Sequence, residues 1–177
     1  MTTTTNTETK KYTKEERELK RQKVLERMIA FCRHNPRSHR DVRNELYTMG
    51  LWKWEREEIL SRLIADDWVN EERFAGHMVT EKMQDWGKVR MRKHLVQQRV
   101  SQYNINRVFK KIDGEEYKKK LYDMAFRKWH SIQGADVSFP FKMRKTSDYL
   151  LRKGYEHNLV METIEKITQG GLKHRHR

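Results

Sequence analysis

The residues that could carry chemistry in this chain of 177 residues are mostly basic side chains, with scattered histidines and several acidic pairs. Neither the eight histidines nor Cys32 stand at a spacing that predicts a zinc site. The pairs Asp66-Asp67 and Glu71-Glu72 offer carboxylates to a divalent ion, but such pairs more often occupy loops and the first turns of helices. Glycine-rich phosphate-binding loops and the GxSxG nucleophile motif do not occur. We therefore expect no enzymatic activity, no metal and no cofactor.

The basic residues gather in the C-terminal half. Residues 88–177 carry 22 Lys/Arg against 9 Asp/Glu, residues 38–87 carry 7 against 11, and residues 1–37 carry 10 against 5. The sign of the charge changes at Gly87. Any one cation could simply solvate a helix face, but a field of this size favours a polyanion such as nucleic acid or a nucleoprotein. The candidate binding residues are Lys88, Arg90, Arg92, Lys93, Arg99, Lys110, Lys111, Lys118, Lys119, Lys120, Arg144, Lys145, Arg152 and Lys153.

The composition favours a thin, helical protein. Hydrophobic and charged residues each make up 36% of the chain and the mean hydropathy is −1.07, so little apolar material is available for one deep core. The N-terminus lacks the apolar region of a signal peptide, and a single cysteine cannot form an internal disulfide. No apolar run approaches the ~20 residues that span a bilayer. We expect a cytoplasmic protein without a membrane segment.

The elements that must position these cations read as amphipathic helices that repeat. When Leu46, Leu95 and Leu150 are set in register, apolar positions coincide four residues before and one, five, fourteen and seventeen residues after the leucine. In that order the sets are Val42, Met91, Thr146; Tyr47, Val96, Leu151; Leu51, Val100, Tyr155; Leu60, Phe109, Ile164; and Leu63, Ile112, Ile167. The first three sets and the leucines predict the buried stripe of one helix and its end, and the last two predict a second helix.

The first helix of each unit should end at the position four residues after the aligned leucine. This position holds Gly50, Arg99 and Gly154, and glycine there fits a left-handed C-cap, from which Arg99 departs. A third helix follows in the first two units. Its apolar residues Phe74, Met78 and Trp86 are echoed at identical spacing by Tyr117, Leu121 and Trp129.

The sequence thus predicts an all-α fold, an elongated tandem array of three-helix repeats that resemble helix-turn-helix units. The expected order is a disordered tail 1–12, an N-terminal helix 13–37, acidic repeat 1 at 38–87, basic repeat 2 at 88–132, a linker 133–140, a two-helix basic repeat 3 at 141–168 and a disordered basic tail 169–177. Trp68, Trp86 and Trp129 are expected in cores. Trp52 and Trp54 stay open to another role, such as base stacking.

Residues 70–95, "NEERFAGHMVTEKMQDWGKVRMRKHL", resemble the signature of the RecX family of regulatory proteins: an acidic-Arg-Phe-Ala helix start, a glycine joint and a basic helix with an apolar-x-x-x-Leu core. "CRHNPRSHRDVRNELYTMGL" is similar to that family's first repeat and "FKMRKTSDYLLRKGYEHNLVMETIEKI" to its last. The resemblance covers residues 28–168. The signature residues Arg73, Phe74, Gly87 and Leu95 are expected to act in packing and turn geometry.

The resemblance implies a non-enzymatic modulator of the RecA recombinase in DNA repair, recombination and the SOS response. RecX proteins lie in the helical groove of the RecA filament on single-stranded DNA and limit filament growth, ATP hydrolysis and strand exchange. The expected partners are the RecA filament and, weakly and without sequence preference, single-stranded DNA, and the expected state is a monomer.

Two other readings stay open. A helix-turn-helix transcriptional regulator is the alternative, because each unit resembles that motif, although here the cations spread over at least five predicted helices. A helical scaffold without nucleic acid leaves the basic half unexplained.

Overall fold

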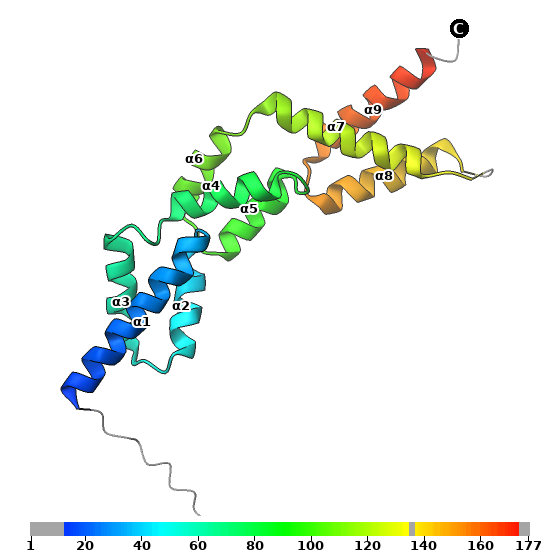
Figure 1. Cartoon of the computed structure of the whole chain (residues 1–177). Coiled ribbons are helices and arrows are strands. Elements are labelled where there is room, and N and C mark those ends of the chain that lie inside the picture. The colour runs from blue at the N-terminus through cyan, green and yellow to red at the C-terminus, as the bar shows by residue number, and fades with distance from the viewer. Residues whose placement is uncertain (1–12, 135–136, 174–177) are drawn as a thin grey trace, which may run out of the picture. The chain divides into compact units, whose positions relative to one another are not determined.

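The computed structural model describes residues 13–134 and 137–173, and all regular secondary structure within them is α-helical, as expected. The tail expected at 1–12, and residues 174–177 of the tail expected at 169–177, lie outside the described residues. The helices of Figure 1 are α1 (Lys14–His34), α2 (His39–Thr48), α3 (Lys53–Ala65), α4 (Glu71–Lys82), α5 (Lys88–Gln97), α6 (Gln102–Lys110), α7 (Gly114–Ser131), α8 (Phe139–Lys153) and α9 (His157–Lys173).

Side-chain caps begin several of these helices. Thr13 and Ser38 each form a capping box, with Glu16 and Asp41 respectively, so that the free backbone amides of the first turn find acceptors. The carboxylate of Asp113 accepts the first amides of α7 in the same way. Short polar residues in the breaks between apolar stripes therefore set where α1, α2 and α7 start.

The chain divides into two compact units, and the first ends at Asn70. In unit 1, helices α1, α2 and α3 surround one core, in which Met28, Leu46 and Leu63 are fully buried. Helix α1 contributes Val24, Met28 and Cys32 to this core, so it is a full member of the first three-helix bundle.

Unit 2 begins at Glu71 and holds two adjoining cores. Helices α4, α5 and α6 enclose the first, and α7, α8 and α9 enclose the second. Met83 and Ile112 pack against both. Their shared contacts join the two bundles within this unit.

The groups of helices that share a core begin one helix earlier than the repeats predicted at 38–87, 88–132 and 141–168. Each core takes the helix that precedes the aligned leucine helix, so α1 joins α2 and α3, and the last bundle has three helices. The reason is that α1 presents Val24 and Met28 just as α4 presents Phe74 and Met78. Gly87 consequently lies between two helices that share a core.

The leucine register itself is confirmed. Leu46, Leu95 and Leu150 are fully buried. The position after each leucine, expected in the buried stripe, instead points outward: Tyr47, Val96 and Leu151 are 73%, 54% and 37% exposed. A step of one residue turns by about 100° around a helix, which carries these side chains off the buried face.

The turn after each leucine helix keeps one backbone form. The φ angles are 64° at Gly50, 61° at Arg99 and 87° at Gly154, so Arg99 adopts the left-handed conformation without being glycine. In the last two of these turns the following residue donates to the leucine carbonyl: Val100 to Leu95 at 3.1 Å and Tyr155 to Leu150 at 3.2 Å. The left-handed form costs a non-glycine residue about 1 kcal/mol, which the buried packing on either side of Arg99 overrides.

The C-terminal helix is longer than expected. Helix α9 runs to Lys173, so the first residues of the tail expected at 169–177 are helical. Two glycines at 170 and 171 do not end it, because glycine lowers helix stability by only about 1 kcal/mol and keeps its backbone amide. Across the described residues, no helix combines the length and the apolar character that crossing a membrane requires.

The register makes a stability prediction for unit 2. Leu95→Ala and Leu150→Ala should each lower the free energy of unfolding by about 2–5 kcal/mol, because each removes a buried side chain from a packed core. The exposed neighbours supply matched controls: Val96→Ala and Leu151→Ala should change it by about 0.5 kcal/mol or less. Urea unfolding followed by circular dichroism measures all four. Wild-type midpoints for both buried variants would show that the repeat register is wrong.

Candidate functional site

The start of α5 and the end of α8 meet through their backbones. The amide of Gly87 donates to the carbonyl of Lys153 at 2.9 Å, and the amide of Val89 donates to that of Gly154 at 3.0 Å. Gly87 has no side chain to cap α5, so the last carbonyls of α8 accept the amides that a cap would otherwise satisfy. The negative end of the α8 dipole also faces the positive end of α5.

Both glycines at this contact are required by the close approach. A Cβ on Gly87 would overlap the carbonyl of Gly154, and a Cβ on Gly154 would lie 2.6 Å from the backbone nitrogen of Arg90. Gly154 also needs its left-handed φ. The glycine at the charge boundary is thus half of a contact between two helices of unit 2.

A buried tyrosine secures the same contact. The hydroxyl of Tyr117 on α7 accepts the amide of Lys88 at 2.9 Å and donates to the Glu156 carboxylate at 2.7 Å. Burial raises the pKa of Tyr117, and the hydrogen bond to Glu156 raises it further. The hydroxyl therefore stays protonated and keeps its donor role. Its ring packs 5.4 Å from that of Tyr155, which follows Gly154.

A groove of about 470 Å³ lies beside this contact, and we call it the α5–α8 groove. Its lining residues are Trp86, Val89, Arg90, Lys93, His94, Gln97, Leu151, Arg152 and Gly154. None of these described lining residues is acidic. Arg90 lies 4.2 Å over the ring of Trp86, and the exposed side chains of Arg90, Lys93 and Arg152 form no ion pair with a described carboxylate.

The groove can therefore hold anionic groups. Guanidinium groups bind phosphate or carboxylate oxygens through paired hydrogen bonds, and lysine adds a mobile point charge. Val89 and Leu151 supply an apolar part of the lining. A chain that offers anionic groups beside flat or apolar parts fits this combination.

Four of the candidate cations are half-buried and satisfied inside the protein. Lys88 lies 4.6 Å over the Tyr117 ring, and Arg92 donates to Asn106 and covers the Phe109 ring. The other two are ion-paired: Lys120 with Glu116 at 2.8 Å and Lys153 with Asp85 at 3.6 Å. Because of these contacts, the four side chains are engaged within unit 2 and are less available to an external anion.

The other candidates are exposed. Lys111, Lys118 and Arg144 form ion pairs at 2.8, 3.0 and 3.9 Å, with Glu72, Glu115 and Asp148 respectively. Such pairs on the surface are weak, so a stronger anion can displace them. The candidates that keep an exposed charge without an ion pair to a described carboxylate are Arg90, Lys93, Arg99, Lys110, Lys119, Lys145 and Arg152.

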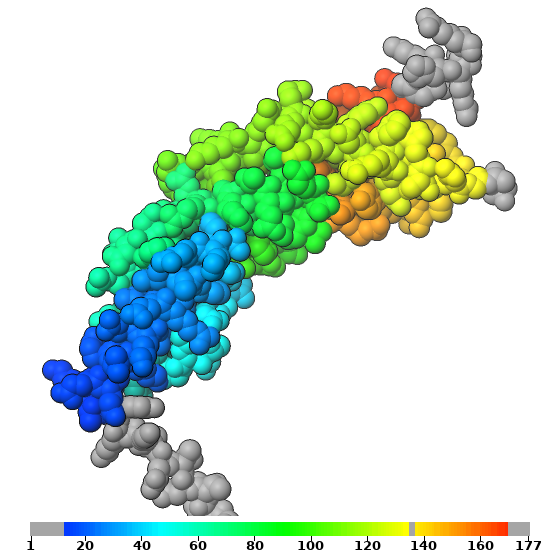
Figure 2. All heavy atoms as spheres, viewed as in Figure 1, coloured from blue at the N-terminus to red at the C-terminus, as the bar shows by residue number. Residues whose placement is uncertain are grey.

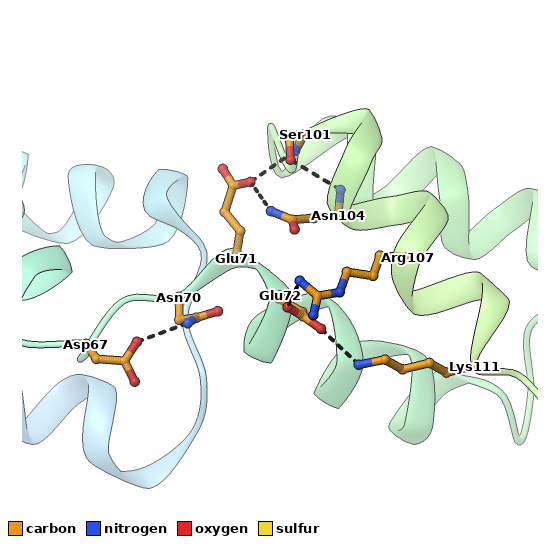
Figure 3. Close-up of polar contacts among 8 residues, drawn as sticks. All are labelled: Asp67, Asn70, Glu71, Glu72, Ser101, Asn104, Arg107 and Lys111. Carbon is orange, nitrogen blue, oxygen red and sulfur yellow. Dashed lines mark hydrogen bonds and ion pairs between the residues drawn. The ribbon is translucent and has the colours of Figure 1, made fainter.

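The acidic pair at the start of α4 organises α6, as Figure 3 shows. The Glu71 carboxylate accepts the Ser101 amide at 3.1 Å and the Asn104 side chain at 3.0 Å, at the first turn of α6. Glu72 pairs with Arg107 and Lys111 at 2.9 and 2.8 Å. The hydrogen bond from Lys111 and the charge of Arg107 lower the pKa of Glu72.

These carboxylates have structural partners, which agrees with the capping and loop roles favoured for them. The described residues contain no group of three or more side chains suited to a metal ion. Among the signature residues, Phe74 and Leu95 lie in the first core of unit 2, Gly87 makes the helix contact and Arg73 is exposed.

The tryptophans divide as expected. Trp68, Trp86 and Trp129 are partly buried against cores, whereas Trp52 and Trp54 are 67% and 56% exposed. The sequence did not predict that the Tyr117 hydroxyl would join Lys88 and Glu156. It indicated only that Tyr117 belongs to an apolar stripe.

Comparisons with known proteins agree on one family name. No family model matches the chain. The regulatory protein RecX of Clostridium acetobutylicum is 22% identical over 143 residues, which cover 80% of this chain and 67% of that protein. A crystal structure of RecX from Lactobacillus salivarius aligns with a TM-score of 0.75 at 17% identity, over 86% of this chain and 99% of that one. A second crystal structure, of a regulatory protein RecX, aligns with a TM-score of 0.73 at 15% identity, over 88% and 79%.

The helix contact predicts unequal costs for two glycine substitutions within unit 2. Gly87→Ala should lower the free energy of unfolding by at least about 2 kcal/mol, because the new methyl group must push α5 and α8 apart. Gly87 has a φ of −77°, so backbone strain adds nothing to this cost. Gly114→Ala is the control, since nothing lies within 4 Å of a Cβ there. Equal urea midpoints for the two variants would contradict the close contact.

Proposed function

We propose that this chain, a member of the RecX family, binds the RecA filament on single-stranded DNA and inhibits its ATPase and strand-exchange activities. We also propose that the protein is non-enzymatic, monomeric and cytoplasmic. Its direct contact with single-stranded DNA is weak and independent of sequence.

The observation that carries the proposal is the α5–α8 groove on a fold shared with RecX structures. A nucleoprotein filament presents phosphates and acidic side chains over long distances. A groove with three cations and no acidic described lining residue attracts such a surface. The paired glycines fix the two helices, so the backbone positions that carry the three cations are set before the partner binds.

A helix-turn-helix regulator is the second candidate, and two contacts speak against it. The second helix of such a unit reads bases with its N-terminal turn in the major groove. The corresponding turn of α6 is occupied by the Glu71 carboxylate, which would repel phosphates. The start of α5 is likewise covered by the end of α8.

Charge reversal in the groove tests the proposal. The triple variant Arg90→Glu, Lys93→Glu and Arg152→Glu should raise the dose that halves the DNA-dependent ATPase of RecA by at least about tenfold, because attraction becomes repulsion. Lys88 and Arg92 are left unchanged, since both are half-buried and have partners inside the protein.

The matched control reverses three exposed cations of unit 1. Lys14→Glu, Arg17→Glu and Lys53→Glu remove the same charge from surface positions at or near helix starts, where an anion is tolerated. Circular dichroism verifies that both variants keep their helices. Wild-type inhibition by the groove variant, or an equal loss in the control, would reject the groove as the working surface.

Salt dependence supplies a further expectation. Binding to single-stranded DNA should weaken with potassium chloride, with a log–log slope of roughly −2 if the three groove cations each contact a phosphate. The slope should be shallower for the groove variant. Fluorescence anisotropy of a labelled oligonucleotide measures it, and a flat response of the wild-type protein would remove phosphate contacts from the account.

A further inference from the structure

An exposed aromatic ladder runs along α7, on the side away from its core. Tyr122, Phe126 and His130 follow one another at every fourth residue, with ring centroids 6.1 and 4.0 Å apart. Tyr122 is 39% exposed and Phe126 is 43% exposed. The buried face of α7 uses Leu121 and Met124 instead, so these rings are not needed to close the core.

The start of α8 carries further exposed aromatic rings near the end of α7. Phe139 is 56% exposed and packs edge-on, with ring centroids 5.7 Å apart, against Trp129, the residue before His130. Phe141 is 47% exposed. In Figure 2 these segments, coloured yellow, form part of the molecular surface that faces the viewer. We call this set the aromatic tip: Tyr122, Phe126, Trp129, His130, Phe139 and Phe141.

Lysines are interleaved with these rings. The ammonium groups of Lys142 and Lys145 lie 5.0 Å from the Trp129 ring and 5.3 Å from the Phe141 ring. Lys119 falls on the ladder side of α7 by its spacing of three and seven residues from Tyr122 and Phe126. None of the three lysines pairs with a described carboxylate.

This combination selects the class of partner. Protein interfaces use aromatic residues and arginine but are depleted in lysine, which argues against a protein surface. Proteins that hold single strands combine cations along the backbone with aromatic rings on which bases stack. A duplex hides the faces of its bases within its own stack. The tip therefore fits unpaired bases joined by phosphates.

One exposed ridge of α8 connects the tip with the α5–α8 groove. Phe141, Lys145 and Arg152 are separated by four and seven residues, which places them on one side of the helix. The helix spans roughly 20 Å from its start at the tip to its end at the groove, at about 1.5 Å per residue. One extended strand can follow this ridge.

We propose that the aromatic tip is a binding site for unpaired nucleobases, and that a single strand runs from it along α8 to the α5–α8 groove. The proposal deepens the proposed function by naming where bases are held, but it makes a prediction about nucleic acid in the absence of RecA.

Two labelled oligonucleotides of about 20 nucleotides test it on the full chain: oligothymidylate and an abasic strand of the same length. Stacking contributes to the first and phosphate contacts to both. The wild-type protein should bind oligothymidylate at least about fivefold more tightly than the abasic strand, and Tyr122→Ala with Phe126→Ala should abolish that ratio. Fluorescence anisotropy gives both dissociation constants.

Two comparisons separate the possible outcomes. The variant Tyr47→Ala with Trp52→Ala, which removes exposed aromatic rings of unit 1, should keep the ratio. The groove variant should weaken both oligonucleotides alike. Equal affinity of the wild-type protein for the two strands, or a ratio that survives loss of the ladder, would overturn the proposal. If the wild-type protein prefers oligothymidylate over the abasic strand as expected but does not inhibit RecA, the proposed function is rejected and the nucleobase site is retained.

Discussion

The contact between the end of α8 and the start of α5 is the constraint on which the rest of unit 2 depends. Without a side chain at residue 87, the first amides of α5 need acceptors, and the last carbonyls of α8 supply them. The two helix ends can approach this closely only because both residues at the contact are glycine. The same approach brings Arg90 and Arg152, 62 positions apart in the chain, to one groove.

Much of the fold follows from the periodic apolar residues. Leu46, Leu95 and Leu150 mark equivalent helices because each sits at the centre of a three-helix core, where burial tolerates little variation. The left-handed turn was foreseeable at Gly50 and Gly154. At Arg99, where a departure was expected, the turn persists because the surrounding packing outweighs the local strain. The grouping of helices was not foreseeable, because an amphipathic stripe does not show whether it packs against the preceding or the following helix.

The site was only partly readable from the sequence. Charge counting drew attention to residues 88–177 but could not separate exposed cations from those that are half-buried against internal partners. Lys88 and Arg92 carry the same formal charge as Arg90 and Lys93, yet the first two are half-buried against Tyr117 and Phe109, whereas the other two are exposed. That distinction depends on neighbours up to 29 residues away, which no local pattern encodes. The partner of Gly87 is more distant still.

These features give unit 2 a predominantly basic surface, whereas the charges of unit 1 are mixed. Lysine acetylation of the chain, alone and with RecA filaments on single-stranded DNA, is the most direct test that unit 2 is the working surface. The filament should slow acetylation of Lys93 and leave Lys14 and Lys53 unchanged, as mass spectrometry would show. Unchanged reactivity of Lys93, with protection of Lys14 and Lys53, would contradict the account.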